Sequence, residues 1–419
     1  MASITIQQVI DNRLCHYCGT CEGICPKNAI KSEFDGNIWT PTIDKHQCDH
    51  CGLCYTVCPG RKVSCNFNFL LGSYLRCYAS SSKDKKIKNM GSSGGIVTTI
   101  SLMLLKKKLV DGIVVLGMSL EKPWLPKVKI AYTPDEVMKA AQSKYVLYPV
   151  NKILREISKS DKTFAFVGIP CQIHGIKNVM KENEEIRRKI KYTIGLFCGS
   201  NPPFAATRYL IDKFANKDVE GVKSLEYRAG AFPGHFKAVF KDGDIIDIPK
   251  NKYGFVNRLF PIHRCNLCLD HTNELADISV GDAWGYGKRN TAYVILRTEK
   301  GSDIFSKILP FIEAKRIDEK TVIHGQYSML YNKKVRAVAR YNILNKKRHP
   351  VPEYNIYNKH VSVITIVFEK LFLFFDGLLQ HQVFIKLIFY LPVKVGKATS
   401  SFINLFNRVG INHWRTIYD

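Results

Sequence analysis

The chain has 419 residues, a length that indicates two or three domains. Hydrophobic residues make up 46% and charged residues 23% of the chain, which excludes an intrinsically disordered protein. The formal net charge is +26, but Lys and Arg are spread along the whole sequence, so we expect no nucleic-acid partner. Docking to an acidic protein or to an anionic membrane surface stays open.

Fourteen cysteines raise the question of disulfide bonds. Met1 to Gln8 lacks the basic region and apolar run of a signal peptide. Eight of the cysteines stand in two runs of equal spacing, which is typical of metal ligation in a reducing compartment. We therefore expect a cytoplasmic protein.

The two runs share the spacing C-x2-C-x2-C-x3-C-P. Two-residue gaps let three thiolates of one loop meet one [4Fe-4S] cubane, and we expect the fourth cysteine to start a helix that leads to the other site. Zinc fits badly, because its structural sites use two separated ligand pairs. The expected ligands are Cys15, Cys18, Cys21 and Cys58 for cluster one, and Cys48, Cys51, Cys54 and Cys25 for cluster two.

After this module we expect a polar linker, Ser80 to Asn89, and then an α/β domain in which helices and strands alternate. A more β-rich part includes a hairpin turning at Asp242-Gly243. In chain order the expected helices are 96–108, 134–142, 151–158, 173–181 and 203–214, and the expected strands are 112–116, 128–132, 163–168, 192–197, 222–227, 236–240, 245–248 and 292–296.

A glycine-rich segment, Gly91-Ser92-Ser93-Gly94-Gly95, opens the first of these helices. Free amides at a helix N-terminus bind phosphate well. The segment is neither a dinucleotide fingerprint nor a Walker loop. Phosphate binding and a plain flexible helix start both remain open.

Four further cysteines predict a third metal site. Cys171 and Cys198 each follow a predicted strand, at the sheet edge where α/β proteins bind ligands, and Cys265 and Cys268 form a C-x2-C pair. The alternatives are buried core cysteines for the first two and zinc for the pair. Cys65 and Cys77 are interpreted as structural.

Together these motifs resemble the beta-subunit family of coenzyme F420 hydrogenases and dehydrogenases, which includes 7-hydroxymethyl chlorophyll a reductase. The resemblance covers about residues 10 to 325. It rests on the glycine-rich segment, Ser143-Lys144-Tyr145, Gly168-Ile169-Pro170-Cys171-Gln172, Gly195-Leu196-Phe197-Cys198-Gly199, Cys265-x2-Cys268 and Ala276-Asp277-Ile278-Ser279-Val280-Gly281-Asp282.

The resemblance implies FAD beside a third [4Fe-4S] cluster on Cys171, Cys198, Cys265 and Cys268. It also implies that Gly91, Ser92, Ser93, Gly94, Gly95, Lys144 and Asp282 contact the flavin. The flavin is needed because clusters pass single electrons, whereas an organic substrate exchanges hydride. The sequence assigns no catalytic residue. His174 is either a proton donor or, as we expect, a satisfied core histidine.

We therefore expect an iron–sulfur flavoprotein oxidoreductase with a redox partner protein, either a ferredoxin or another component of an oxidoreductase complex. Its second partner is a small-molecule hydride acceptor or donor, and coenzyme F420 is one candidate. The alternative function is a non-catalytic, polyferredoxin-like carrier or accessory protein, as in surface-polysaccharide biosynthesis.

The expected domains are a ferredoxin-type module (1–74), a mixed α/β catalytic domain (75–325) and a helical tail (326–419), an α+β and α/β combination. Residues 321–419 contain 14 basic and 4 acidic residues. The apolar segment Val361 to Leu391 is interrupted by polar residues, so we expect it not to span a membrane. Leu371, Phe374, Phe375, Leu378 and Leu379 recur at helical spacing, and Lys394, Lys397 and Arg408 follow. Peripheral contact with the inner membrane face, partner binding and internal packing are the alternatives.

Overall fold

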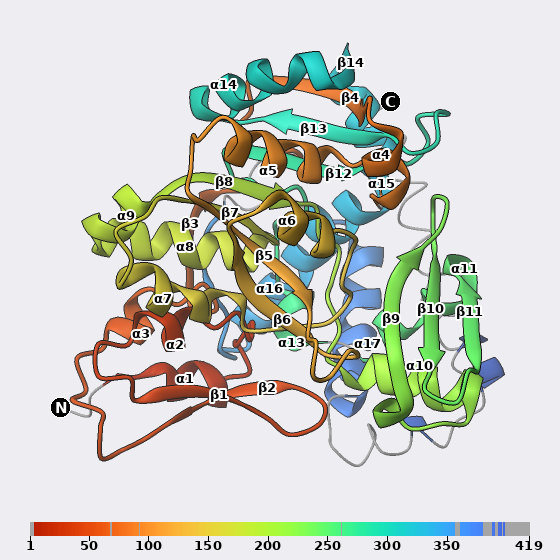
Figure 1. The fold of residues 1–419 in the computed structure, drawn as a ribbon. Helices are drawn as coiled ribbons and strands as arrows, with labels where there is room; N and C mark the ends of the chain where they lie inside the picture. The colour runs from red at the N-terminus through yellow and green to blue at the C-terminus, as the bar shows by residue number, and fades with distance from the viewer. Residues whose placement is uncertain are drawn as a thin grey trace.

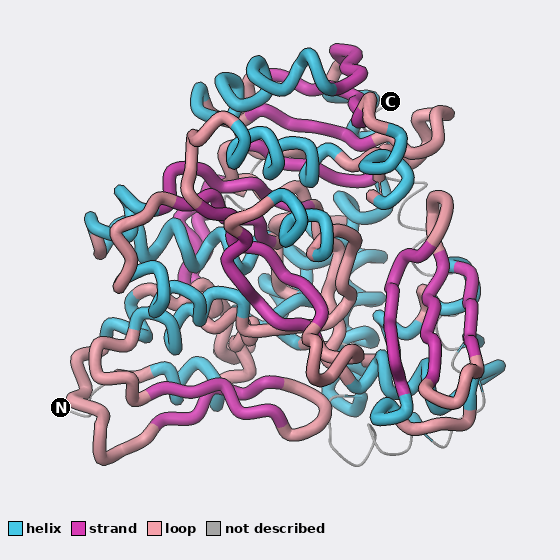
Figure 2. The backbone as a smooth tube through the Cα atoms, viewed as in Figure 1, coloured by secondary structure: helices cyan, strands magenta, loops and turns pink. Residues whose placement is uncertain are grey.

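The computed structural model describes residues 4–67, 69–91, 93–260, 262–356, 361–379, 388–389, 393–395 and 397–398. A mixed β-sheet runs through the centre, with helices on both faces (Figure 1). The amino-terminal module lies against the helices of one face, and a smaller sheet stands at the side (Figure 2).

The central sheet joins segments from most of the chain. Strands β12, β8, β7 and β5 are parallel, so their carboxyl ends share one edge, whereas the outer strands pair antiparallel. Among the described residues its strands, in spatial order, are β14 (Ile312–Ile317), β4 (Arg76–Ser82), β13 (Ala292–Leu296), β12 (Ile278–Asp282), β8 (Ile190–Leu196), β7 (Phe164–Gly168), β5 (Gly112–Met118) and β6 (Pro126–Ala131).

Alternating side chains bury both faces of this sheet. Ile113 and Val115 pack with the helices of one face, and Val114, between them, packs with those of the other. The first face is covered by α5 (Ile96–Lys106), α6 (Pro134–Lys139) and α14 (Glu299–Ile308), and the second by α7 (Leu154–Ser158), α8 (Pro170–Glu182) and α15 (Glu319–Tyr331). The remaining elements near the sheet are α4 (Lys85–Met90), η1 (Val150–Ile153), α9 (Glu184–Lys189), η3 (Leu309–Phe311), η4 (Asn332–Arg336) and α16 (Ala337–Lys346).

The amino-terminal module is small and built around its cysteine loops. Its hairpin is held by Phe34 and Trp39, which face each other across the strands with ring centroids 4.2 Å apart. Its elements are α1 (Ile6–Asp11), α2 (Thr20–Ile24), β1 (Ile30–Phe34), β2 (Trp39–Ile43) and α3 (Leu53–Thr56). Strand β3 (Lys62–Asn66) follows and pairs in parallel with β15 (Glu353–Asn355).

The predicted hairpin around Asp242-Gly243 is confirmed. Gly243 has a φ of +96°, a left-handed conformation that glycine adopts without strain. The three-stranded antiparallel sheet is formed by β9 (Val222–Ala229), β10 (His235–Phe240) and β11 (Ile245–Pro249). The elements around it are α10 (Ala205–Ala215), η2 (Val219–Gly221), α11 (Lys250–Tyr253), α12 (Val256–Leu259) and α13 (His263–Asn266).

Two sequence-based expectations are wrong. Ser80 to Asn89 is not a linker, because β4 lies inside the central sheet and α4 follows it. The serines of β4 are small enough to be buried under α5, where Thr99 donates to Ser82 at 3.1 Å. The fourth cysteine of each run does not start a helix either. Helices α2 and α3 begin after Gly19 and Gly52, so the third cysteine lies in the helix and the fourth follows it.

The tail forms helix α17 (Val363–Leu379), which packs beside α16 (Figure 1). The expectation that the apolar tail does not span a membrane is confirmed for the described part of the chain, where no helix has sufficient length and apolarity. Arg408 lies outside the described residues, and so do the side chains of Leu378 and Leu379.

Candidate redox site

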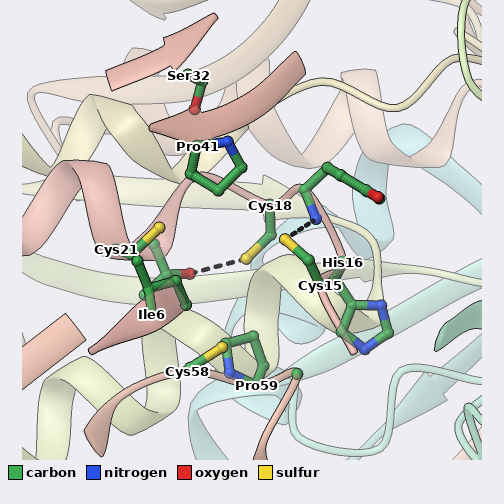
Figure 3. Close-up of a pocket in the computed structure, with 13 residues that line it drawn as sticks. Ile6, Cys15, His16, Cys18, Cys21, Ser32, Pro41, Cys58 and Pro59 are labelled. Atoms are coloured by element: carbon green, nitrogen blue, oxygen red, sulfur yellow. Dashed lines mark hydrogen bonds between the residues drawn. The ribbon is translucent and has the colours of Figure 1, made fainter. Parts of the chain in front are cut away.

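The four cysteines expected to hold cluster one lie around one hollow. Figure 3 shows Cys15, Cys18, Cys21 and Cys58 around this hollow. Burial raises the pKa of the Cys15 thiol well above its ordinary value, and Cys58 and Cys18 raise it further. The structure thus brings a cysteine of the second run to three of the first.

Three of the four cysteines expected for cluster two also lie together. The pKa of Cys54 is raised by burial and then by Cys25 and Cys51, although a backbone N–H of Ile6 lowers it. Cys48 precedes Cys51 on the same loop, where its N–H donates to the Asp44 carbonyl at 3.1 Å. The exchange of the fourth cysteine is therefore reciprocal: Cys58 lies with the first run and Cys25 with the second.

The two cysteine loops repeat one backbone conformation. Tyr17 and His50 have φ angles of +56° and +58°, and Gly19 and Gly52 have φ angles of +82° and +75°. Left-handed residues turn successive amides toward the inside of the loop. In the first loop the Tyr17 N–H donates to the Cys15 sulfur at 3.2 Å, as cluster ligands require. The duplication in sequence is therefore a duplication in structure.

The third set of cysteines comes from three segments. Cys171 lies in the first turn of α8, Cys198 follows β8, and Cys265 and Cys268 lie in and after α13. Burial raises the pKa of Cys171 well above its ordinary value, and Cys18 and the other three cysteines of this set raise it further. Two of the four cysteines are buried and two are half-buried, so a cation is needed to hold them together as thiolates.

The third set has the thiol donors that an iron–sulfur cluster uses. Its side chains do not converge as the ligands of one metal ion would. Across the described ranges, no three His, Cys, Asp or Glu side chains converge as a ligand group for one metal ion. The proximity of the cysteines therefore rests on their burial and their mutual effects on pKa. Asn273 braces the edge they share, because its side-chain amide donates to the carbonyls of Gly168 and Leu196 at 2.9 and 3.2 Å.

Cluster one and the third set are adjacent across the contact between α2 and α8. Glycines let α2 pack closely on η1, through Gly23, and let α8 pack closely on α2, through Gly175. A Cβ on Gly23 would lie 2.2 Å from the Asn151 carbonyl oxygen, and a Cβ on Gly175 would lie 2.1 Å from Thr20 Oγ1. The absence of two side chains thus lets α2 pack closely on η1 and α8, and Cys18, just before α2, raises the pKa of Cys171 in α8.

Buried cations surround this junction. Arg264 is fully buried and donates to the carbonyls of Pro59 and Gly60, beside Cys58, at 3.1 and 3.0 Å. Lys333 is also buried and donates to the Cys265 carbonyl at 3.0 Å. Charges of this sign stabilise the negative charge of a thiolate-ligated cluster.

His16 lies at the same junction and lacks a partner. The side chain is 3% exposed, and neither ring nitrogen has a hydrogen-bond partner among the described residues. Burial lowers its pKa well below the ordinary value, and Arg264, His174 and Lys333 lower it further. A buried N–H without an acceptor is costly, so His16 indicates an acceptor that the polypeptide does not supply.

The glycine-rich segment has a structural explanation of its own. A Cβ on Gly94 would lie 2.6 Å from the Asn290 oxygen, and one on Gly95 would lie 2.6 Å from the Ile87 oxygen. Gly91 would meet the backbone of Gly95, and Ser93 is half-buried. Ser92 lies outside the described residues. That this segment binds flavin phosphate stays a prediction.

Lys144 is buried, and its amine donates to the carbonyls of Ala140, Ala141 and Gln142 at 2.5, 2.6 and 3.0 Å. Burial lowers its pKa to about 7, and Lys129 contributes to the shift. The side chain therefore holds the loop after α6, next to Tyr145.

Asp282 ends β12 and pairs with Arg228 of β9. The Arg228 guanidinium contacts both carboxylate oxygens, at 2.8 and 3.0 Å, and the Tyr145 hydroxyl at 3.5 Å. Lys250 lies 3.8 Å from the centre of the Tyr145 ring. Burial lowers the pKa of Lys250 to about 7, and Arg228 lowers it while Asp282 raises it. Arg228 and Lys250 therefore form a cationic cluster around Asp282 and Tyr145, and Lys144 reaches it only through the loop that it holds next to Tyr145.

A hydrogen-bonded path joins this cluster to the third cysteine set. The Cys198 N–H donates to the His271 carbonyl at 2.9 Å, and His271 Nε2 lies 2.9 Å from Gln326 Oε1. The Gln326 amide donates in turn to the Asp282 carbonyl at 2.5 Å. Two residues, His271 and Gln326, therefore connect Cys198 of the third cysteine set to Asp282.

His174 is buried and hydrogen-bonded to a carboxylate. Its Nε2 lies 2.8 Å from Asp270 Oδ2. Burial opposes the Asp270 charge, yet His174 lowers the pKa of that carboxyl to about 2. This is the arrangement of a satisfied core histidine. Cys77 is buried on β4, and Cys65 lies 3.9 Å from Glu274, away from the three cysteine sets.

Sequence reasoning missed Arg228, Lys250, His271 and Gln326. Arg228 and Lys250 flank the predicted hairpin but carry no motif. Gln326 lies beyond the end of the resemblance, on α15. Only His271, three residues after Cys268, stood near a recognised motif.

Three family models match the chain. Residues 14–63 match the 4Fe-4S dicluster domain. Residues 77–155 match the amino-terminal part, and residues 161–322 the carboxyl-terminal part, of the coenzyme F420 hydrogenase/dehydrogenase beta subunit. The last two together span more than half of the 419 residues.

Curated relatives give the same result. The chain is 29% identical over 257 residues to coenzyme F420 hydrogenase subunit beta of Methanosarcina barkeri, covering 59% of this chain and 84% of that protein. It is 26% identical over 315 residues to the coenzyme F420-dependent sulfite reductase of Methanocaldococcus jannaschii, covering 71% and 46%. It is 29% identical over 234 residues to the chloroplastic 7-hydroxymethyl chlorophyll a reductase of Oryza sativa, covering 52% and 47%.

A solved structure is similar as well. One chain of the F420-reducing [NiFe] hydrogenase complex from Methanosarcina barkeri superimposes with a TM-score of 0.53 at 25% identity, covering 65% of this chain and 94% of that one. The chain therefore belongs to the coenzyme F420 hydrogenase/dehydrogenase beta-subunit family.

Proposed function

We propose that this protein is an iron–sulfur oxidoreductase in which electrons cross a line of three [4Fe-4S] clusters to a flavin, which exchanges hydride with an organic molecule. The carrying observation is the position of Cys18, which belongs to cluster one yet raises the pKa of Cys171 in the third set. At the other side, Cys54 of the second set raises the pKa of Cys21 in cluster one. The sets thus follow one another in space.

The residues present fit iron–sulfur clusters. Each set contributes thiolate donors, which [4Fe-4S] clusters prefer. Arg264 and Lys333 supply buried positive charge beside Cys58 and Cys265. The unpartnered ring of His16 supplies an N–H for which cluster sulfur is a suitable acceptor.

The cationic cluster around Asp282 fits a phosphate-bearing group such as FAD. Two cations stand near this carboxylate, the buried Arg228 and the half-buried Lys250, and Lys144 supports the loop that carries Tyr145. Burial lowers the pKa of both lysines to about 7, which indicates that an additional anion would stabilise their charged forms. When bound, FAD would convert between one-electron and two-electron transfer.

The chain's own groups have separate tasks in this proposal. Lys250 and Arg228 bind and orient the anionic part of the cofactor. Gln326 and His271 link Asp282 to Cys198 by hydrogen bonds and would position the flavin pocket relative to the third cluster. The glycine-rich segment, whose Gly94 carbonyl accepts the Ser82 N–H at the end of β4, would contact the flavin phosphates.

The partners follow from the same arrangement. Cysteines of the second set are the most exposed, with Cys51 exposed and Cys48 half-buried, so an external redox protein meets the line of clusters there. That protein is a ferredoxin or another component of an oxidoreductase complex. The organic molecule is a small hydride acceptor or donor, and coenzyme F420 is the first candidate because relatives are named for it. We place the protein in the cytoplasm, where thiols stay reduced.

Cofactor analysis of anaerobically purified protein tests the proposal. We expect about twelve irons and one FAD per chain, from three [4Fe-4S] clusters and one flavin. Reduction by dithionite should give cubane signals in EPR, and stopped-flow spectra should show flavin reduction after cluster reduction. Assays with coenzyme F420 and with nicotinamides would then identify the hydride partner.

Two results would revise the proposal differently. Full iron without flavin would support the carrier or accessory function, including one in surface-polysaccharide biosynthesis. Zinc in place of iron would reject electron transfer altogether.

A further inference from the structure

Helix α17 turns its charged side inward. Glu369 is 1% exposed and pairs with the guanidinium groups of Arg336 and Arg340. Further along the helix, Asp376 is 2% exposed, 3.2 Å from His263 Nδ1 and 2.7 Å from the Asn266 amide. The acidic residues of this helix are therefore its anchors to α13, η4 and α16.

The opposite side of α17 is apolar and exposed. The exposed fractions are 65% for Phe374 and 51% for Phe375, with Lys370 exposed between the apolar positions. The other members of this exposed face are Val363 (76%), Ile364 (60%), Val367 (50%) and Leu371 (50%). The amphipathic pattern is the reverse of that expected for a helix packed on a protein core.

Helix α17 cannot rotate so that its apolar side faces inward, as the apolar side of an amphipathic helix usually does. Rotating α17 to bury Phe374 and Phe375 would expose Glu369 and leave Arg336 and Arg340 buried without their partner. A buried charge without a partner is strongly destabilising. The exposed face is consequently a stable property of the fold, and the described residues do not cover it with an apolar surface of their own.

The positive charge of the chain favours an anionic lipid surface as the environment of this apolar face. The protein carries a net charge of +26. Four basic residues near α17 are buried, but Lys346, Lys347 and Arg348 at the end of α16 are exposed, as is Lys370 on α17 itself. Anionic lipid head groups attract such surfaces, and aromatic side chains enter the head-group boundary readily. No described helix is able to span a bilayer, so contact would be in the plane of the membrane.

We propose that the exposed face of α17 docks on an anionic phospholipid surface, with Phe374 and Phe375 inserted and Lys370 at the head groups. The contact does not depend on the cofactors proposed above. A protein partner or a second copy of this chain are the competing occupants.

Vesicle flotation of the full-length holoprotein tests the docking. We expect flotation with vesicles of phosphatidylcholine and phosphatidylglycerol, and loss of flotation with phosphatidylcholine alone or at high salt. The double variant Phe374→Ser/Phe375→Ser should lower partitioning at least about tenfold, because two phenyl rings no longer leave water. Equal iron content would show that each variant is folded.

A matched pair of exposed phenylalanines provides the control. Phe69 and Phe311 are 60% and 39% exposed on other surfaces, so Phe69→Ser/Phe311→Ser should float like the wild type. Wild-type protein that ignores anionic vesicles would overturn the proposal, and so would equal flotation of the Phe374→Ser/Phe375→Ser variant. Sedimentation in which that variant alone loses self-association would assign the face to a second copy instead.

Discussion

The side-chain amide of Asn151 donates to Thr20 Oγ1 at 2.9 Å and so joins the amino-terminal module to the central domain. The same amide donates to the carbonyl of Gln172 at 2.8 Å. Thr20 Oγ1 lies 3.1 Å from the Cys18 sulfur, and Gln172 follows Cys171. One buried side chain therefore positions ligand segments of two separate cysteine sets.

Replacing Asn151 should weaken this junction. Asn151→Leu leaves Thr20 and the Gln172 carbonyl without their donor, so we expect the free energy of unfolding to fall by about 2 kcal/mol. Anaerobic denaturant titration of the holoprotein measures this change. Asn355 is exposed on β15, and Asn355→Leu should leave stability unchanged. Equal stability of the two variants would show that the junction is not held at Asn151.

The third cluster should be separable from the other two. Cys171→Ser removes a ligand of the third set only, so we expect loss of about four of about twelve irons, with the ferredoxin-type EPR signals retained. Cys77 is equally buried but lies on β4 among apolar side chains, and Cys77→Ser should retain all iron. Retention of full iron in Cys171→Ser would remove Cys171 from the ligand set.

His16 should tune a cluster without holding iron. His16→Phe removes an N–H that would donate to cluster sulfur and so stabilise the reduced, more negative form of the cluster. We therefore expect an unchanged iron content and a more negative midpoint potential in an EPR-monitored titration. A potential equal to that of the wild type would mean that the histidine only fills space.

Lys250 should make flavin binding depend on pH. Burial lowers its pKa to about 7 in the absence of an anion, and a bound phosphate would raise that pKa. The charged form binds the anion, so affinity is full below pH 7 and falls as pH rises, by up to about tenfold per unit, until the raised pKa of the complex is passed. The affinity at each pH can be measured by fluorescence titration of FAD with protein from which the flavin has been removed.

The same titration of Lys250→Met is the control. Loss of one charge-assisted contact should weaken binding by about tenfold at neutral pH and flatten the pH profile. The groups facing Lys250 are the rings of Tyr145 and Tyr253 and the charges of Arg228 and Asp282. A profile unchanged by the substitution would assign the pH dependence to another group.

The sequence predicted the parts of this protein that depend on local pattern. Spacing alone indicated both cysteine loops, and hydrophobic runs located most strands of the parallel core. The serines of β4 led to the wrong prediction of a linker, because short polar side chains occur in linkers and equally in tightly packed strands. What decides between the two is the neighbouring helix, which sequence periodicity does not reveal.

The residues of the candidate site also fall into those that a local sequence pattern indicates and those that it does not. Cys171 and Cys198 were found because strand ends share an edge, whereas Arg228 and Gln326 reach the site from elements with no motif. Their roles depend on tertiary contacts with Asp282, across 54 and 44 residues of sequence. The sequence also did not reveal that the apolar side of α17 faces outward, because apolar residues at helical spacing predict an apolar inner face.

Gly23 and Gly175 have a consequence for the speed of the protein. Electron tunnelling slows exponentially with the thickness of the barrier between two centres. The contact of α2 with η1 at Gly23 and with α8 at Gly175 leaves no room for even a methyl group. In the proposed line of clusters, close packing at these two glycines would keep the barrier between cluster one and the third cluster thin.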